Sequence, residues 1–203
     1  MRQKNSTRHG FVAMARKLYH PLRFNHGYNF ILFFITAGAM LGFSLSRLMY
    51  LDINRVFCKA GSTKGAAPGE CYYYSGKGGS RYRVGIILHL AAILPAGLLV
   101  GFQFVPAIRH KALLLHRASG YLIIMLSLTS MAGAFMITDK AFGGELLTQT
   151  ITGLAAVMFL ASLLLAYINI KRLQIEQHRA WMLRAWSYVW ASHFSSSIMC
   201  MHG

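Results

Sequence analysis

Acidic residues are the scarcest charged groups in this 203-residue chain, because five Asp and Glu stand against 21 Lys and Arg. All five lie outside the long apolar runs, at Asp52, Glu70, Asp139, Glu145 and Glu176. Carboxylates inside a bilayer mark proton relays, so their absence from these runs argues against a proton pump that uses such a relay. It also argues against catalysis by a buried general-acid carboxyl, including protonation-initiated cyclisation of prenyl substrates.

Charge of either sign is rare, since 13% of the residues are charged and 55% are hydrophobic. An average soluble domain carries about 25% charged residues. The formal net charge of +16 comes from bases in the gaps between the apolar runs. This placement suits lipid headgroups and topology control, and no RNP-like, zinc-finger or basic-helix motif favours nucleic acid. The composition predicts an integral membrane protein whose partner is the lipid bilayer and not nucleic acid.

The lengths of the apolar runs predict an all-α, polytopic transmembrane bundle of about five helices. A bilayer core of about 30 Å needs about 20 apolar helical residues. We expect a basic cytoplasmic tail at 1–27, a bundle at 28–203 with helices at about 28–50, 84–108, 116–138, 147–170 and 180–201, and an outer loop at 51–83. The Lys and Arg of the short loops at 109–117 and 171–179 predict a cytoplasmic N-terminus and an outer C-terminus.

The basic N-terminal segment lacks a short apolar stretch followed by small residues, so we expect no secretory signal peptide. A cytoplasmic tail on a protein of the plasma membrane or an endomembrane is the favoured interpretation. A mitochondrial presequence has a similar composition, and the mitochondrial inner membrane is therefore the alternative location.

Cysteine is rare, with three residues in the chain. Cys58 and Cys71 share the 51–83 loop, whereas Cys200 is far away in sequence. In an outer, oxidising compartment a Cys58–Cys71 disulfide would close a loop of about 14 residues and add roughly 3 kcal/mol of stability. We predict this bond and, without accompanying histidines, no zinc site here.

Small residues mark two helix faces. Gly38 and Gly42 form a small-xxx-small pattern, which suits either a dimer face or packing within the monomer. On the next helix His89 shares a face with small residues and one amide: Ala92, Ala96, Gly97, Gly101 and Gln103. We therefore expect His89 to point inward.

Four histidines fall at two expected depths in the bundle. His89 and His193 would meet in its outer half, whereas His116 and His178 would meet at the cytoplasmic boundary. Two histidine pairs on neighbouring helices can hold b-type haem, with imidazole as the axial ligand. One hypothesis is therefore a haem protein with a redox role, acting across the membrane or on a small lipid-soluble substrate, with no metal other than haem iron.

The alternative hypothesis is a non-enzymatic membrane scaffold or small-molecule carrier. An inward His89 can simply hydrogen-bond a serine or a carbonyl. His116 and His178 each precede an arginine, and such pairs anchor to lipid phosphate. No nucleophile or metalloprotease signature such as GxSxG or HExxH occurs, so whether the protein is an enzyme stays open.

Three stretches, LHLAAILPAGLLVGFQFVPAIR, HRASGYL and QHRAWMLRAW, resemble the DUF2306 family of predicted multi-pass membrane proteins. The resemblance covers about residues 84–190 and implies the architecture rather than a mechanism. It singles out His89, Gln103, Arg109, His116, Arg117, His178, Arg179 and Arg184; the arginines we assign to interface anchoring. Similar proteins usually continue beyond Tyr188 with a further Arg and another helix, which sets His193 apart.

Overall fold

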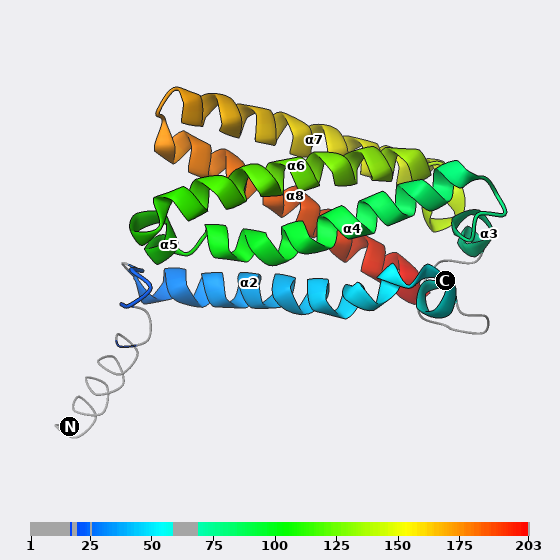
Figure 1. The fold of residues 1–203 in the computed structure, drawn as a ribbon, viewed down its shortest axis with the longest axis horizontal. Coiled ribbons are helices and arrows are strands. Elements are labelled where there is room, and N and C mark those ends of the chain that lie inside the picture. Colours follow the sequence, from blue (N-terminus) through cyan, green and yellow to red (C-terminus); the bar gives the residue numbers. More distant parts are fainter. Residues whose placement is uncertain (1–16, 18–19, 25, 59–68, 203) are drawn as a thin grey trace, which may run out of the picture. The chain divides into compact units, whose positions relative to one another are not determined.

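The computed structural model describes residues 17, 20–24, 26–58 and 69–202, with side chains described as far as residue 191. The described part is helical and contains no strand, which confirms the all-α prediction (Figure 1). The elements are α2 (Gly27–Arg47), η1 (Leu48–Leu51), η2 (Ile53–Phe57), α3 (Glu70–Tyr74), α4 (Ser80–Gln103), α5 (Pro106–Lys111), α6 (Leu113–Ile137), η3 (Ala141–Gly144), α7 (Leu146–Lys171) and α8 (Ile175–His202).

Four helical segments are long and apolar enough to cross a membrane: Gly27–Leu51, Ser80–Gln103, Leu113–Ile137 and Leu146–Lys171. They confirm a multi-pass integral membrane protein. In the described residues α8 does not join them, and the fifth crossing stays a prediction.

The second span differs from its predicted bounds of 84–108. Helix α4 starts earlier, continues through Pro95 and ends at Gln103. Its end is explained by Pro106, which lacks an N–H and disfavours helical geometry at the residue before it. Val105 is extended accordingly (φ −76°, ψ 115°), and the short helix α5 begins at the proline.

The chain divides into two compact units, residues 1–51 with 90–130 and residues 52–89 with 131–203. In the first unit, α2 packs against the glycines of α4. A Cβ added at Gly97 would lie 2.7 Å from Ser44 Oγ, and one at Gly101 would lie 3.9 Å from Ala37 Cβ. By contrast, a Cβ at Gly38 or Gly42 would meet no described atom of this unit within 4 Å, so the predicted packing within the monomer is not seen for them.

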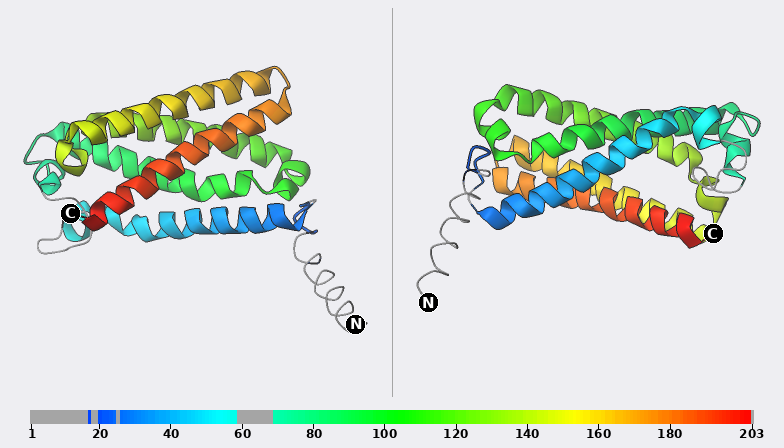
Figure 2. Two further views of the ribbon diagram at one scale, coloured as in Figure 1. Left: turned by 180° about the vertical axis from the view of Figure 1, so that it is seen from behind. Right: turned by 90° about the horizontal axis from the view of Figure 1, so that it is seen from below.

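In the second unit α4 and α6 cross backbone to backbone. A Cβ added at Gly133 of α6 would lie 2.6 Å from Gly85 O and 2.6 Å from His89 N, both on α4. Helices α7 and α8, yellow-orange and orange-red in Figure 2, pack around a core of Phe159, Leu163 and Ala185. Phe159 also contacts the edge of Trp186, with ring centroids 6.2 Å apart.

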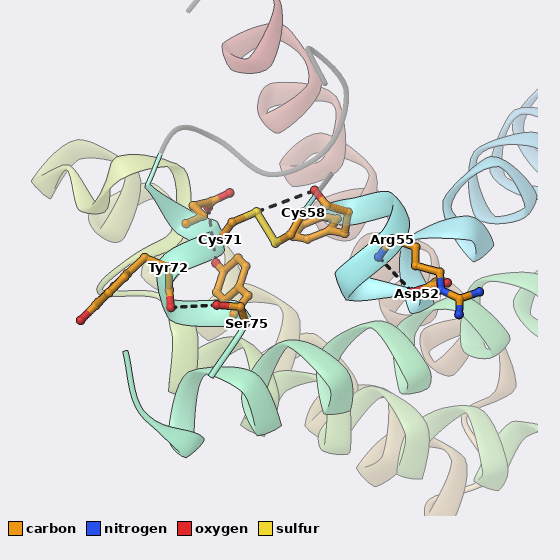
Figure 3. Close-up of a disulfide and its surroundings, with 9 residues drawn as sticks. Asp52, Arg55, Cys58, Cys71, Tyr72 and Ser75 are labelled. Atoms are coloured by element: carbon orange, nitrogen blue, oxygen red, sulfur yellow. Dashed lines mark hydrogen bonds between the residues drawn. A yellow bond between two sulfur atoms is a disulfide. The ribbon is translucent and has the colours of Figure 1, made fainter. Parts of the chain in front are cut away.

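The described residues 52–58 and 69–79 precede α4 in the second unit, and we call them the cap. Cys58 and Cys71 are joined by a disulfide, with Cα atoms 5.4 Å apart (Figure 3). Next to it, the Glu70 side chain is 5% exposed. Its Oε1 accepts a hydrogen bond from the Phe142 backbone N (2.6 Å) and one from the Tyr74 hydroxyl (3.4 Å). The Glu70 carboxylate therefore ties the cap to η3.

The cap provides a topology prediction, because a disulfide persists in an oxidising compartment. A reporter fused at the N-terminus should read cytoplasmic, and one fused at the C-terminus should read lumenal or extracellular, as the Lys and Arg distribution predicts. Glycosylation-tag or protease-protection mapping measures both ends. Two reporters on the same side would contradict the five-helix arrangement.

Candidate functional site

His178 is the best-defined of the predicted histidines. It lies in α8, three residues after the helix begins, and its Nδ1 is 2.9 Å from the carbonyl oxygen of Ala166 in α7. A carbonyl only accepts hydrogen bonds, so Nδ1 is the donor in this contact and Nε2 is the ring nitrogen that the contact does not use. The contact therefore leaves Nε2 as the nitrogen available for coordination.

The turn between α7 and α8 places His178 against Ala166. Leu173 takes a left-handed conformation (φ 59°), which reverses the chain. Gln174 N donates to Asn169 O (2.9 Å), and His178 N donates to Gln174 O (2.9 Å). The first turns of α8 consequently return along the last turns of α7, and Ala166 is fully buried between them.

One helical turn further on, α8 carries a guanidinium–indole pair. The Arg184 guanidinium carbon lies 4.6 Å from the Trp181 ring centroid. Trp186 is 3% exposed, and its Nε1 has no hydrogen-bond partner among the described residues. An indole N–H usually finds a partner when buried, so this atom is a polar group left over by the α7–α8 packing.

His89 lies at the α4–α6 crossing and is half-buried. Its backbone is held against Gly133, and the small residues that it shares a face with are buried: Ala92 is 3% exposed and Ala96 is fully buried. This burial supports the face predicted from the sequence.

His116 belongs to the other unit, near the start of α6. It is half-buried, its Nδ1 is buried, and its backbone N donates to Ala112 O (3.0 Å). Close by, Gln103 Nε2 donates to Ser119 Oγ (2.6 Å), which joins the end of α4 to α6. Gln103 thus has a structural role in this unit.

The described contacts do not test the two expected histidine pairs. His89 and His178 fall in one unit, His116 falls in the other, and the side chain of His193 lies outside the described residues. Among the described residues no three His, Cys, Asp or Glu side chains gather as a metal site.

The predicted anchoring arginines are placed on helix surfaces. Arg117, Arg179 and Arg184 are exposed, and Arg109 is half-buried in α5. Their exposure leaves lipid anchoring as a prediction. No sequence pattern marks Glu70 or Trp186 as buried, because their burial depends on partners distant in sequence.

The comparisons with known proteins give one result. No curated protein and no solved structure matches the chain. The family model DUF2306, described as a predicted membrane protein, matches residues 86–202, which is more than half of the chain and runs beyond Tyr188 to include His193. The protein therefore belongs to the DUF2306 family of predicted membrane proteins.

Proposed function

We propose that this membrane protein binds a b-type haem, which His178 would hold through Nε2. The observation that carries the proposal is the bond between His178 Nδ1 and Ala166 O. A histidine that ligates a metal almost always donates its other ring N–H to a carbonyl, carboxylate or water, which fixes the tautomer and orients the ring. His178 has this arrangement.

The position of His178 adds support. It lies on a helix rather than on a loop, and α7 and α8 pack around buried apolar side chains. Ligands on packed helices are held more rigidly than ligands on loops. The pairs of His178 with His116 and of His89 with His193 stay predictions from the sequence, because His116 lies in the other unit and the side chain of His193 lies outside the described residues.

Bound haem would supply one-electron chemistry. The chain's own contribution would be to hold the ring nitrogen and to exclude water with apolar side chains. The proposed role is electron transfer across the membrane or to a small lipid-soluble substrate.

The test is the absorption spectrum of the full chain purified from haem-replete cells. Wild-type protein should have a Soret band that shifts when dithionite is added. His178→Ala should lower the bound haem by about tenfold or more, because loss of a ligand's supporting interaction alone costs roughly that much affinity.

His26→Ala is the matched control, since His26 is exposed and stacks on Tyr28 before the first span. It should keep the wild-type spectrum. Colourless, monodisperse wild-type protein would reject the haem proposal and leave the scaffold or carrier. An unchanged spectrum in His178→Ala would reject His178 as the ligand.

A further inference from the structure

A cationic cavity lies at the end of the first unit where α2 begins. It has a volume of about 480 Å³ and is lined by His20, Arg23, Phe24 and His110. The cavity is open to its surroundings, because His20, Arg23 and His110 are exposed. Three of the four lining side chains carry nitrogen donors, so the cavity suits an anion.

Two segments build the cavity. The turn at 20–24 is closed by a hydrogen bond from Arg23 N to His20 O (2.9 Å), and it is joined to α5 by one from Ala107 N to Leu22 O (3.1 Å). Helix α5 carries His110. These two backbone bonds bring side chains almost ninety positions apart in sequence to one cavity.

Phe24 fixes the turn to α2. It is 8% exposed, and its ring centroid lies 5.6 Å from that of Phe30 and 5.3 Å from that of Phe33. The neighbouring Arg23 has a left-handed backbone (φ 60°), a conformation that costs free energy for a residue with a side chain. Such strain persists where the surroundings hold it, and it is common at ligand sites.

The first unit contains Lys and Arg residues but no acidic residue. Residues 1–51 and 90–130 contain no Asp or Glu, so no carboxylate of the unit can pair with Arg23. No ion pair with an acidic residue of the unit therefore competes with an external anion for Arg23.

The position of the cavity identifies the source of the anion. Its residues lie just before the first span, which starts at Gly27, and just after the second, which ends at Gln103. This is the depth of lipid headgroups, and the same end carries the basic segments that predict the cytoplasmic side, where anionic lipids are enriched.

We infer that the His20–Arg23–His110 cavity binds the phosphate of an anionic phospholipid headgroup. The N–H groups of the planar Arg23 guanidinium would donate to the phosphate oxygens, and the imidazoles of His20 and His110 would add further N–H donors. The Phe24 ring would form the apolar floor. This site is independent of haem binding.

The test uses the full chain in nanodiscs of phosphatidylcholine with about 20 mol% phosphatidic acid. Native mass spectrometry after release counts the bound phosphatidic acid. Wild-type protein should retain it in preference to phosphatidylcholine, and Arg23→Gly/His110→Gln should lower its apparent affinity by about tenfold.

Arg23→Gly separates binding from folding, because glycine adopts the left-handed backbone without strain. The variant should therefore melt at or above the wild-type temperature while it loses lipid. Arg172→Gln, which removes an exposed cation after α7, is the charge-matched control and should change binding by less than about twofold.

Three outcomes would overturn the inference that the cavity binds a lipid phosphate. An equal loss of lipid in Arg172→Gln would mean a general charge effect without a site. Inorganic phosphate that displaces the lipid at equal concentration would mean a soluble anion site. Wild-type protein that retains phosphatidylcholine equally would mean that no anion is selected.

Discussion

Gly133→Ala is expected to lower the free energy of unfolding by about 3 kcal/mol, at the upper end of overpacking costs. The added methyl would lie 2.6 Å from Gly85 O and 2.6 Å from His89 N. Both atoms belong to the backbone of α4 and cannot rotate away, so the two helices must separate. Thermal melting of the purified protein in detergent measures the loss.

Gly153→Ala is the matched control for this substitution. Gly153 lies in α7, where an added Cβ would meet no described atom within 4 Å. Because alanine is a better helix former than glycine by roughly 1 kcal/mol, this variant should be neutral or slightly more stable. Equal destabilisation of both variants would show that the α4–α6 crossing is not closely packed.

Glu70→Ala is expected to cost about 3 kcal/mol. The carboxylate is buried and accepts from the Phe142 backbone N and the Tyr74 hydroxyl, so its removal leaves two donors in a site with little water. Glu70→Gln keeps one carbonyl oxygen and should cost about 1 kcal/mol. Denaturant or thermal unfolding measures both, and equal costs would contradict a carboxylate-specific role.

The loss of stability at alkaline pH tests the contact between Glu70 and Tyr74 in a second way. Burial, together with the nearby Glu70 charge, raises the pKa of Tyr74. A raised pKa means that the neutral tyrosine stabilises the fold fully below its unfolded pKa of about 10, and that this stability is lost as the pH rises above that value. The loss above pH 10 should be smaller in Glu70→Gln, because the charge contribution to the shift is absent.

The spans could be predicted from the sequence because an apolar run of about 20 residues matches the thickness of a bilayer core when it is helical. The end of α4 was predicted too late, although Pro106 was the available signal. The rule for small residues predicted that glycines would pack helices, but it could not say which glycines meet. An added Cβ at Gly97 or Gly133 would meet another helix, whereas one at Gly38 would meet no described atom within 4 Å. Periodicity predicts a helix face but does not identify its partner.

The same limit applies to the candidate sites. The His-Arg pattern was sufficient to single out His178, but the hydrogen bond of its Nδ1 depends on the Ala166 carbonyl, which the turn at Leu173 brings near. Glu70 and Phe142 are 72 positions apart, and no local pattern connects them. The cavity at Arg23 needed both a backbone conformation and a contact with α5.

The disulfide beside α4 also bears on cellular redox chemistry. Helix α4 has 24 residues, and at about 1.5 Å each these span about 36 Å, which is enough to separate two compartments. The Cys58–Cys71 bond at its N-terminal side needs surroundings where glutathione does not reduce it. Under the topology predicted from the Lys and Arg distribution, the segment that follows α4 faces the reducing cytosol, so trapping the two cysteines in intact cells and measuring their redox state gives a second readout of that topology.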